Sequence, residues 1–245
     1  SSGQSNTALG FEALKGFTTG HSNVAIGYES ADTLTTGYGN TFLGFRAGIQ
    51  VTTGYYNIAI GHGALGDGGG TSGYHNIALG ANAAMDVSSG TNNIVIGYNA
   101  GDAMTDTTTT ILIGSFAGSA INSTDANGTV AIGYYAGSAI TSGQKSTLLG
   151  YQAGLAITTG DGNVAVGYTA GDALTTGIQN VAIGTSALGS ADNDESYNVA
   201  IGSHAMATVD DDDADHNIAL GYYALNATTV AASVAIGRES LKANT

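Results

Sequence analysis

Asn23–Tyr28, with the sequence Asn-Val-Ala-Ile-Gly-Tyr, is a phrase that the chain repeats along its whole length. It recurs nearly intact at Asn163–Tyr168 and with substitutions at twelve other places. All fourteen copies keep the glycine, and most neighbouring copies are 17 residues apart, with extremes of 16 and 19. A short fixed period indicates a solenoid or a related repeat array. The glycines, called the repeat glycines below, are Gly10, Gly27, Gly44, Gly61, Gly80, Gly97, Gly114, Gly133, Gly150, Gly167, Gly184, Gly202, Gly221 and Gly237.

The residues before each repeat glycine alternate in character. The residue three before it is Thr, Val or Ile in all fourteen copies, and the residue one before it is Leu, Ile or Val. Residues two apart in a strand point to the same side, so this pair predicts the buried face of a strand. The other side carries an Asn four before the glycine and an Ala two before it, each in ten copies. That side is small enough for close approach by another backbone.

The second half of each repeat predicts a second strand. An apolar residue stands seven after the repeat glycine, as at Phe17, Leu34 and Val51, and a Thr-Thr-Gly turn follows it. We expect this glycine to supply the positive φ of a tight turn. The predicted fold is therefore all-β: a β-solenoid or β-roll of about fourteen 17-residue coils. Residues 1–245 form one repeat array, and both ends fall inside the pattern, so we expect a segment of a longer chain.

Composition excludes several classes of function. A formal net charge of −14 disfavours contact with nucleic-acid phosphates and with anionic lipid. No apolar run approaches the roughly 18 residues of a membrane span, so membrane insertion is not expected, and without cysteine there is no thiolate metal site. Only 10% of the residues are charged, against about 25% in typical domains. This composition is more typical of a fibre than of an enzyme.

No catalytic, cofactor-binding or metal-binding residues are identified. The sequence has no Gly-x-Ser-x-Gly, Walker-type or His-Glu-x-x-His motif, and its five histidines do not share one repeat position. Asp210–Asp213, with Asp215 and His216, suits either a hard cation or a solvated acidic loop. The run lacks the alternating ligand spacing of a calcium loop, which favours the solvated loop. We predict that the protein is not an enzyme and uses no cofactor.

Three rows of recurring side chains have both a structural and a binding interpretation. Stacked coils would place each Asn above the last, as a hydrogen-bonded ladder or as a ligand-contacting row. The Thr pairs indicate either turns or an ice-binding surface. For each of the three rows, the structural interpretation is favoured over the binding one. The aromatic row is either a sugar-stacking strip or a packing row, and its members are Phe11, Tyr28, Phe45, Tyr98, Tyr134, Tyr151, Tyr168 and Tyr222.

Asn6–Gly10, with the sequence Asn-Thr-Ala-Leu-Gly, and the Phe-Glu-Ala-Leu that follows it closely resemble a repeat of bacteriophage tail fibres. The Val-Ala-Ile-Gly core is also similar to the head β-roll of trimeric autotransporter adhesins, whose repeats are usually shorter. The resemblance covers the whole chain and implies a parallel homotrimer: a structural virion tail fibre for host attachment. The alternatives are an adhesin head at the bacterial surface and a carbohydrate-binding spike. The implied partners are the chain itself, other fibre or virion proteins, and a host-surface glycan or protein.

The small side of the strand predicts where such copies would meet. A threefold axis would demand small residues at every level, and the Asn/Ala/Gly side meets that demand. We therefore expect this side to approach the neighbouring chains. Leucine at Ala25, Ala59 or Ala165 would then disturb assembly by overpacking.

Overall fold

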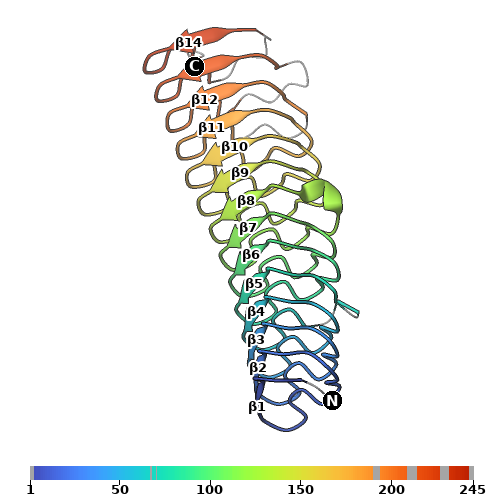
Figure 1. The fold of residues 1–245 in the computed structure, drawn as a ribbon. Coiled ribbons are helices and arrows are strands. Elements are labelled where there is room, and N and C mark those ends of the chain that lie inside the picture. Colours follow the sequence, from blue (N-terminus) through green and yellow to red (C-terminus); the bar gives the residue numbers. More distant parts are fainter. Residues whose placement is uncertain are drawn as a thin grey trace. The chain divides into compact units, whose positions relative to one another are not determined.

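The structure, a computed structural model, describes residues 3–66, 68–69, 71–189, 194–208, 214–226 and 232–242. It is an all-β parallel solenoid with one strand in each of the fourteen repeats, as the period predicts (Figure 1). The chain divides into two compact units, Ser1–Asn127 and Gly128–Thr245, which are described separately below. Within the described residues the one helix is the short 3-10 helix η1, Thr124–Ala126.

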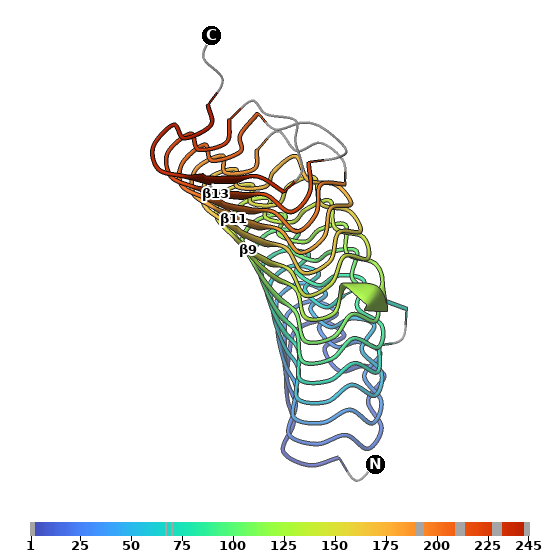
Figure 2. The same ribbon diagram turned by 90° about the horizontal axis from the view of Figure 1, so that it is seen from above.

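Each strand is three residues long, and neighbouring strands in a unit pair in parallel with equivalent residues opposite each other, as in Ala8↔Ala25 and Ala165↔Ala182. Seen along the coils, the strands lie on one wall and the turns complete the loop (Figure 2). The first unit contains β1 Thr7–Leu9, β2 Val24–Ile26, β3 Thr41–Leu43, β4 Ile58–Ile60, β5 Ile77–Leu79, β6 Ile94–Ile96 and β7 Ile111–Ile113. The second contains β8 Val130–Ile132, β9 Thr147–Leu149, β10 Val164–Val166, β11 Val181–Ile183, β12 Val199–Ile201, β13 Ile218–Leu220 and β14 Val234–Ile236.

The repeat glycine ends each strand because stacking leaves no room for a side chain. At Gly27, with φ of +136°, a Cβ would lie 2.2 Å from the carbonyl oxygen of Gly44 in the next coil. At Gly150 the corresponding distance to Gly167 O is also 2.2 Å. A non-glycine residue would suffer both this clash and an unfavourable φ. The invariant glycine therefore reflects close backbone approach between coils.

The predicted direction of the strand faces is wrong. From β2 onward the central alanines of the strands, including Ala25, Ala59 and Ala165, are completely buried, whereas the residues that flank each one remain partly or fully exposed. The Asn/Ala/Gly side thus points into the coil's own interior, and the Val/Ile pair points outward. The central position holds alanine in ten of the fourteen strands and a larger buried residue, such as Phe42 or Leu112, in the others. Leucine at these alanines would enter the coil's own interior and would not report on assembly.

The expected second strand is also absent from most of the described coils. Outside the named strands, the described residues contain one isolated bridge, Val51↔Thr71. Residues two and four after the repeat glycine adopt left-handed φ values, as at Glu29 with 52° and Ala31 with 53°, and an extended strand cannot continue through them. Backbone hydrogen bonds between coils still support the turns, for example Ala31 N to Ala47 O at 2.9 Å.

The glycines of the Thr-Thr-Gly turns serve a different purpose from the one predicted. Gly20, Gly37 and Gly160 do not have positive φ. A Cβ at Gly37 would lie 2.3 Å from Gly54 O, and one at Gly160 would lie 2.3 Å from Gly177 O. As at the strand ends, the requirement is close approach of the next coil, not left-handed backbone.

In the interior, a large side chain on the strand faces a small residue on the opposite side of the coil. Phe42 replaces the usual alanine of β3 and is fully buried, and the residue that faces it is Gly48. A Cβ at Gly48 would lie 2.5 Å from Phe42 Cδ1. In the same way a Cβ at Gly118 would lie 2.8 Å from Leu112 Cδ2. Interiors are close-packed, so a large residue at one position requires glycine at the other.

Candidate interaction surface

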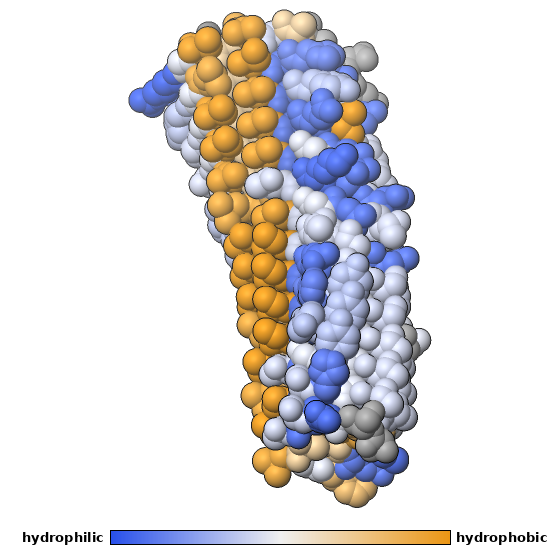
Figure 3. Space-filling view, viewed as in Figure 1, coloured by the Kyte–Doolittle hydropathy of each residue, from blue (hydrophilic) through white to orange (hydrophobic). Residues whose placement is uncertain are grey.

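An apolar stripe runs along the outer face of the strands in each unit. It consists of the first and third residue of every strand, 28 positions that hold only Val, Ile, Leu and three Thr. Figure 3 shows it as two adjacent hydrophobic rows bordered by polar residues. The apolar members that are exposed by 36% to 67% are Leu9, Leu43, Ile58, Ile60, Leu149, Ile183, Ile201, Ile218, Val234 and Ile236.

The stripe is unlike an ordinary protein surface. Monomeric proteins rarely expose a contiguous apolar patch larger than a few hundred Å², and larger patches mark interaction sites. Here the stripe positions, each exposed or half-buried, recur on every coil of each unit, and no stripe position carries a charge. The interior behind them is already filled by the alanines and the residues that face them. The exposed pair therefore adds nothing to the coil's own core.

The asparagine row is an internal ladder, which confirms the structural interpretation. Asn40 donates from Nδ2 to Asn23 Oδ1 at 3.0 Å and to Gly54 O at 2.8 Å, and its own Oδ1 accepts from the backbone N of Asn57 at 2.9 Å. The second unit repeats this pattern, with Asn180 Nδ2 donating to Asn163 Oδ1 at 3.1 Å. These side chains are fully or almost fully buried, so none of them forms a ligand-contacting surface.

The aromatic row that follows the repeat glycines is mainly a stacked row. Tyr28 and Phe45 stack with ring centroids 5.2 Å apart and planes inclined by 8°, and Tyr151 and Tyr168 stack at 5.1 Å and 6°. Phe11 extends the first stack. A sugar needs a free ring face, and in a continuous stack the faces cover one another. The packing interpretation of this row is therefore favoured over a sugar-stacking strip.

The threonine pairs are partly engaged in a second ladder. Thr18 Oγ1 donates to Thr35 O at 2.9 Å, and Thr158 Oγ1 donates to Thr175 O at 3.1 Å. The first hydroxyl of each of these pairs is therefore directed at the next coil. A single exposed row remains, which favours the turn interpretation over an ice-binding surface.

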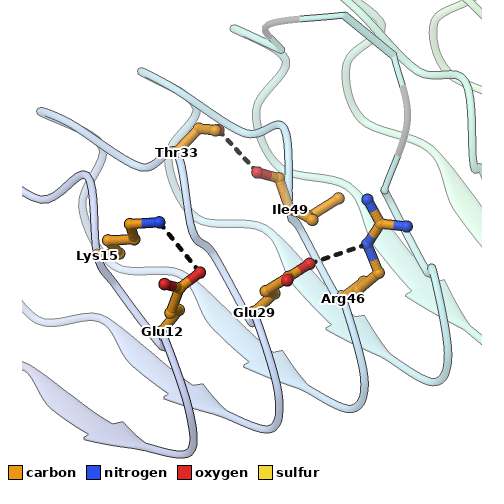
Figure 4. A network of polar contacts seen from close by, with 6 residues as sticks. All are labelled: Glu12, Lys15, Glu29, Thr33, Arg46 and Ile49. Atoms are coloured by element: carbon orange, nitrogen blue, oxygen red, sulfur yellow. Dashed lines mark hydrogen bonds and ion pairs between the residues drawn. The ribbon is translucent and has the colours of Figure 1, made fainter.

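Charged side chains pair locally at the first coils. Glu12 contacts Lys15 at 3.0 Å, and Glu29 contacts the next coil's Arg46 at 3.3 Å (Figure 4). The hydrogen bond from Lys15 to Glu12, reinforced by the charge of Glu12, raises the pKa of the Lys15 amine. Thr33 Oγ1 donates to Ile49 O at 2.7 Å in the same region (Figure 4). Exposed pairs of this kind contribute little to stability because solvent screens them.

The acidic corners show no metal site among the residues that the structure describes. Asp210–Asp213 lie outside those residues. Asp215 Oδ1 accepts a hydrogen bond from the backbone N of Ser196 at 2.6 Å, and His216 stacks on Tyr197. Across the described ranges, no three metal-ligating side chains are grouped and no pocket is found. No helix in that part of the chain is long and apolar enough to cross a membrane.

Two features escaped the reasoning from sequence. The first is the outward direction of the Val/Ile pair, and the second is a row of exposed residues five before each repeat glycine, which includes Tyr56 and His75. The invariance of the Val/Ile pair could have signalled the stripe, because a position inside a coil tolerates compensating changes of size. Comparison with known proteins gives no further guide: no protein-family model, no curated protein and no solved structure matches the chain.

Proposed function

We propose that the chain is a structural fibre segment that works as a parallel homotrimer, with the apolar stripes of three copies packed against one another. The observation that carries this proposal is the exposed stripe itself. Burying apolar surface is worth about 25 cal/mol per Å², and the stripe offers such surface on every coil. A solenoid coil gains stability from its neighbours in the stack, and a second contact across the stripe would add to it.

A second copy of the same chain suits the stripe better than an unrelated partner. Each coil presents two outward aliphatic positions at the spacing of adjacent strands, about 4.8 Å. A parallel copy in the same register offers that spacing at every coil, including those with lengthened turns. Because the stripe carries no charge, the formal charge of −14 on each copy is held by residues elsewhere.

The biological role that we propose is attachment by a bacteriophage tail fibre. Its support is the resemblance of the repeat and the uniformity of the coils, since an enzyme needs one place where polar groups converge. The second candidate is the head of a cell-surface adhesin, which would use the same trimeric solenoid. Antibodies against the chain would separate the two in electron micrographs, by labelling either virion tails or the bacterial surface.

Mass in solution tests the assembly. We expect multi-angle light scattering at micromolar concentration to give three times the 24.2 kDa chain mass. Glutamate in place of Ile60 and Ile183 would bring charges together in the contact, so this double variant is expected to dissociate. The matched control places glutamate at Thr36 and Thr176, which are exposed in the turns, and should remain trimeric.

Circular dichroism shows whether each variant still has the fold of the wild type, so that a loss of assembly can be told from unfolding. Both double variants change outward-facing residues, so both should retain the β-rich spectrum of the wild type. A wild type that is monomeric would contradict the proposed trimer. Loss of assembly in the turn variant, with the stripe variant still trimeric, would place the contact on the wrong side of the coil.

A further inference from the structure

Two rows of outward side chains border the apolar stripe, one at each end of the strands. The upstream row lies five before each repeat glycine, from Ser5 to Ala232, and the downstream row lies one after it, from Phe11 to Arg238. Every residue of both rows is exposed or half-buried. The two rows and the stripe between them thus form one outer face of the coils in each unit.

This outer face carries no acidic residue. The chain has 19 Asp and Glu residues, yet the two rows and the stripe contain none, and their only charged residues are Lys145 and Arg238. Carboxylates begin directly outside: Glu12 and Glu29 follow the downstream row, and Asp161 precedes the upstream row. The core of a protein interface is depleted of charged residues and enriched in aromatic ones. The charge-poor zone is therefore wider than the stripe and includes both rows.

The two rows are related in size, coil by coil. No coil carries Phe or Tyr in both rows. Tyr56 in the upstream row shares its coil with His62 in the downstream row, and Tyr197 shares its coil with Ser203. All upstream glycines lie in coils with a downstream Phe or Tyr, in the pairs Gly39 with Phe45, Gly128 with Tyr134 and Gly162 with Tyr168.

Contacts within one copy do not explain this relation. The two rows are six residues apart in each coil and stand at opposite ends of the strand, so their backbones are separated by roughly 15–20 Å. Tyr56 stacks on His75, and Tyr197 stacks on His216, both within the upstream row. Residues of unlike rows would come into contact only between copies.

The backbone does not decide which upstream residues are small. It is left-handed at Gly128, with φ of 77°, and also at Tyr56, with φ of 54°. A Cβ at Gly128 or at Gly162 would meet no atom closer than 3.5 Å, an ordinary contact distance, although at Gly39 the ring of Tyr56 takes this space. Gly128 and Gly162 therefore leave open space on the surface of their own copy.

We propose that the downstream row of one copy packs against the upstream row of the next copy at the same coil, and that this contact fixes the register of the assembly. Copies related by rotation about the stacking direction bring unlike rows together at equal levels, so large residues meet small ones. An antiparallel pair would instead bring each row against its own kind. The inference rests on the proposed assembly of parallel copies through the stripe, and adds what makes their alignment specific.

The stripe alone does not fix the register. Its aliphatic positions repeat at about 4.8 Å, so a copy displaced by one coil would fit it equally well. The rows oppose such a displacement in both directions. One direction would place Tyr56 against Phe45, and the other would place Tyr197 against Tyr222. Overpacking of this kind is destabilising.

Cross-linking tests the contact between unlike rows, because the chain has no natural cysteine. The variant Ser22→Cys/Tyr28→Cys has one thiol in each row of the same coil, and a short bismaleimide joins thiols that lie close together. We expect covalent products of two and three chains on a denaturing gel. Each single variant should remain a single chain, as should Ser22→Cys/Tyr98→Cys, whose thiols are four coils apart.

Light scattering of the same samples before cross-linking separates this proposal from the trimer. A trimeric sample whose same-coil pair does not cross-link, or whose single variants do, would overturn the contact between rows and leave the trimer. A dimeric sample that cross-links only through the same-coil pair would refute the trimer and support the rows. A monomeric sample would refute both.

An exchange of size within one coil tests the register. Ser203→Tyr would place a second tyrosine opposite Tyr197, and we expect it to raise the concentration at which half of the assembly dissociates by about tenfold or more. Within one copy a ring fits this row, since Tyr151 and Tyr168 stack at 5.1 Å one coil apart. Ser203→Tyr/Tyr197→Gly recreates the pairing of Tyr168 with Gly162 and should restore assembly. A single variant that assembles like the wild type, or a double variant as weak as the single one, would overturn the proposal.

Discussion

At the scale of single residues, the buried asparagine links three successive coils. Asn57 donates from its backbone N and from Nδ2 to Asn40 Oδ1, and its own Oδ1 accepts from the backbone N and Nδ2 of Asn76. Its Nδ2 also donates to Gly73 O at 2.9 Å. An apolar residue of similar size would leave several of these groups unsatisfied in the interior. This explains why polar residues alone occupy the position.

Asn57→Ala should therefore be strongly destabilising. It leaves the backbone N of Asn76 and the carbonyl of Gly73 without this partner, at a cost of about 1–3 kcal/mol for each buried group. The measurement is the midpoint of urea unfolding. Asn57→Thr should cost less, because Thr110 holds the equivalent position and donates from Oγ1 to Asn93 Oδ1 at 2.8 Å. The account fails here if alanine and threonine are equally tolerated, or if alanine at the exposed Asn92 costs as much.

The carboxyl group of Asp172 should make the free energy of unfolding depend on pH. Burial raises its pKa, with partial opposition from a hydrogen bond to its own backbone N, and its Oδ1 has no hydrogen-bond partner. The folded chain therefore holds this proton more tightly than the unfolded chain, whose aspartates have a pKa of about 3.9. The contribution of this carboxyl group to the free energy of unfolding is fully present below the unfolded-state pKa. It is lost as the pH rises through the pKa of the folded state.

Asp172→Asn should remove this loss. We expect the variant to unfold at a higher urea concentration than the wild type at pH 7, and at an equal one near pH 3. The exposed Asp125→Asn is the matched control, since it changes the net charge by the same amount. A gain at both pH values, or the same gain in Asp125→Asn, would show that burial of Asp172 is not the cause.

At the scale of elements, the location of each strand could be predicted from sequence, but the direction of its faces could not. The period places β2 and β10 correctly, because the repeat glycine marks where close stacking begins. A three-residue strand with apolar residues at both ends is ambiguous: the pair can line either the coil or a contact outside it. The sequence between the repeat glycine and the Thr-Thr-Gly turn also does not indicate left-handed backbone. Residues such as Glu29 and Ala31 nevertheless adopt it, in place of the expected second strand.

The pairing of Phe42 with Gly48 gives a prediction at this scale. Gly48→Ala should cost about 1–2 kcal/mol for its left-handed φ of 63°, and about 1–3 kcal/mol more for overpacking against Phe42. Phe42→Ala alone should cost about 3–5 kcal/mol. In the double variant the overpacking disappears, so alanine at residue 48 should cost only the backbone part. Equal costs of Gly48→Ala in both backgrounds, measured by urea unfolding, would contradict the proposed compensation.

At the scale of the whole molecule, the outward stripe replaces the small face as the proposed contact between copies. The trimer came from a resemblance, and the face assigned to it came from the size of side chains alone. Size could not distinguish a crowded coil interior from a crowded axis, since both demand alanine and glycine. The stripe supports the same assembly through a different surface: exposed aliphatic residues such as Ile60 and Ile183, at 39% and 36% exposure.

Distances between spin labels on different copies test this contact most directly. The chain has no cysteine, so Ile60→Cys, Ile183→Cys and the turn variant Thr36→Cys each carry one label. A parallel trimer that meets at the stripe predicts a short, narrow distance in samples labelled at Ile60 alone and at Ile183 alone, and a longer one at Thr36. The account is contradicted if Thr36 gives the shortest distance, or if Ile60 and Ile183 approach each other only in a mixture of the two labelled chains.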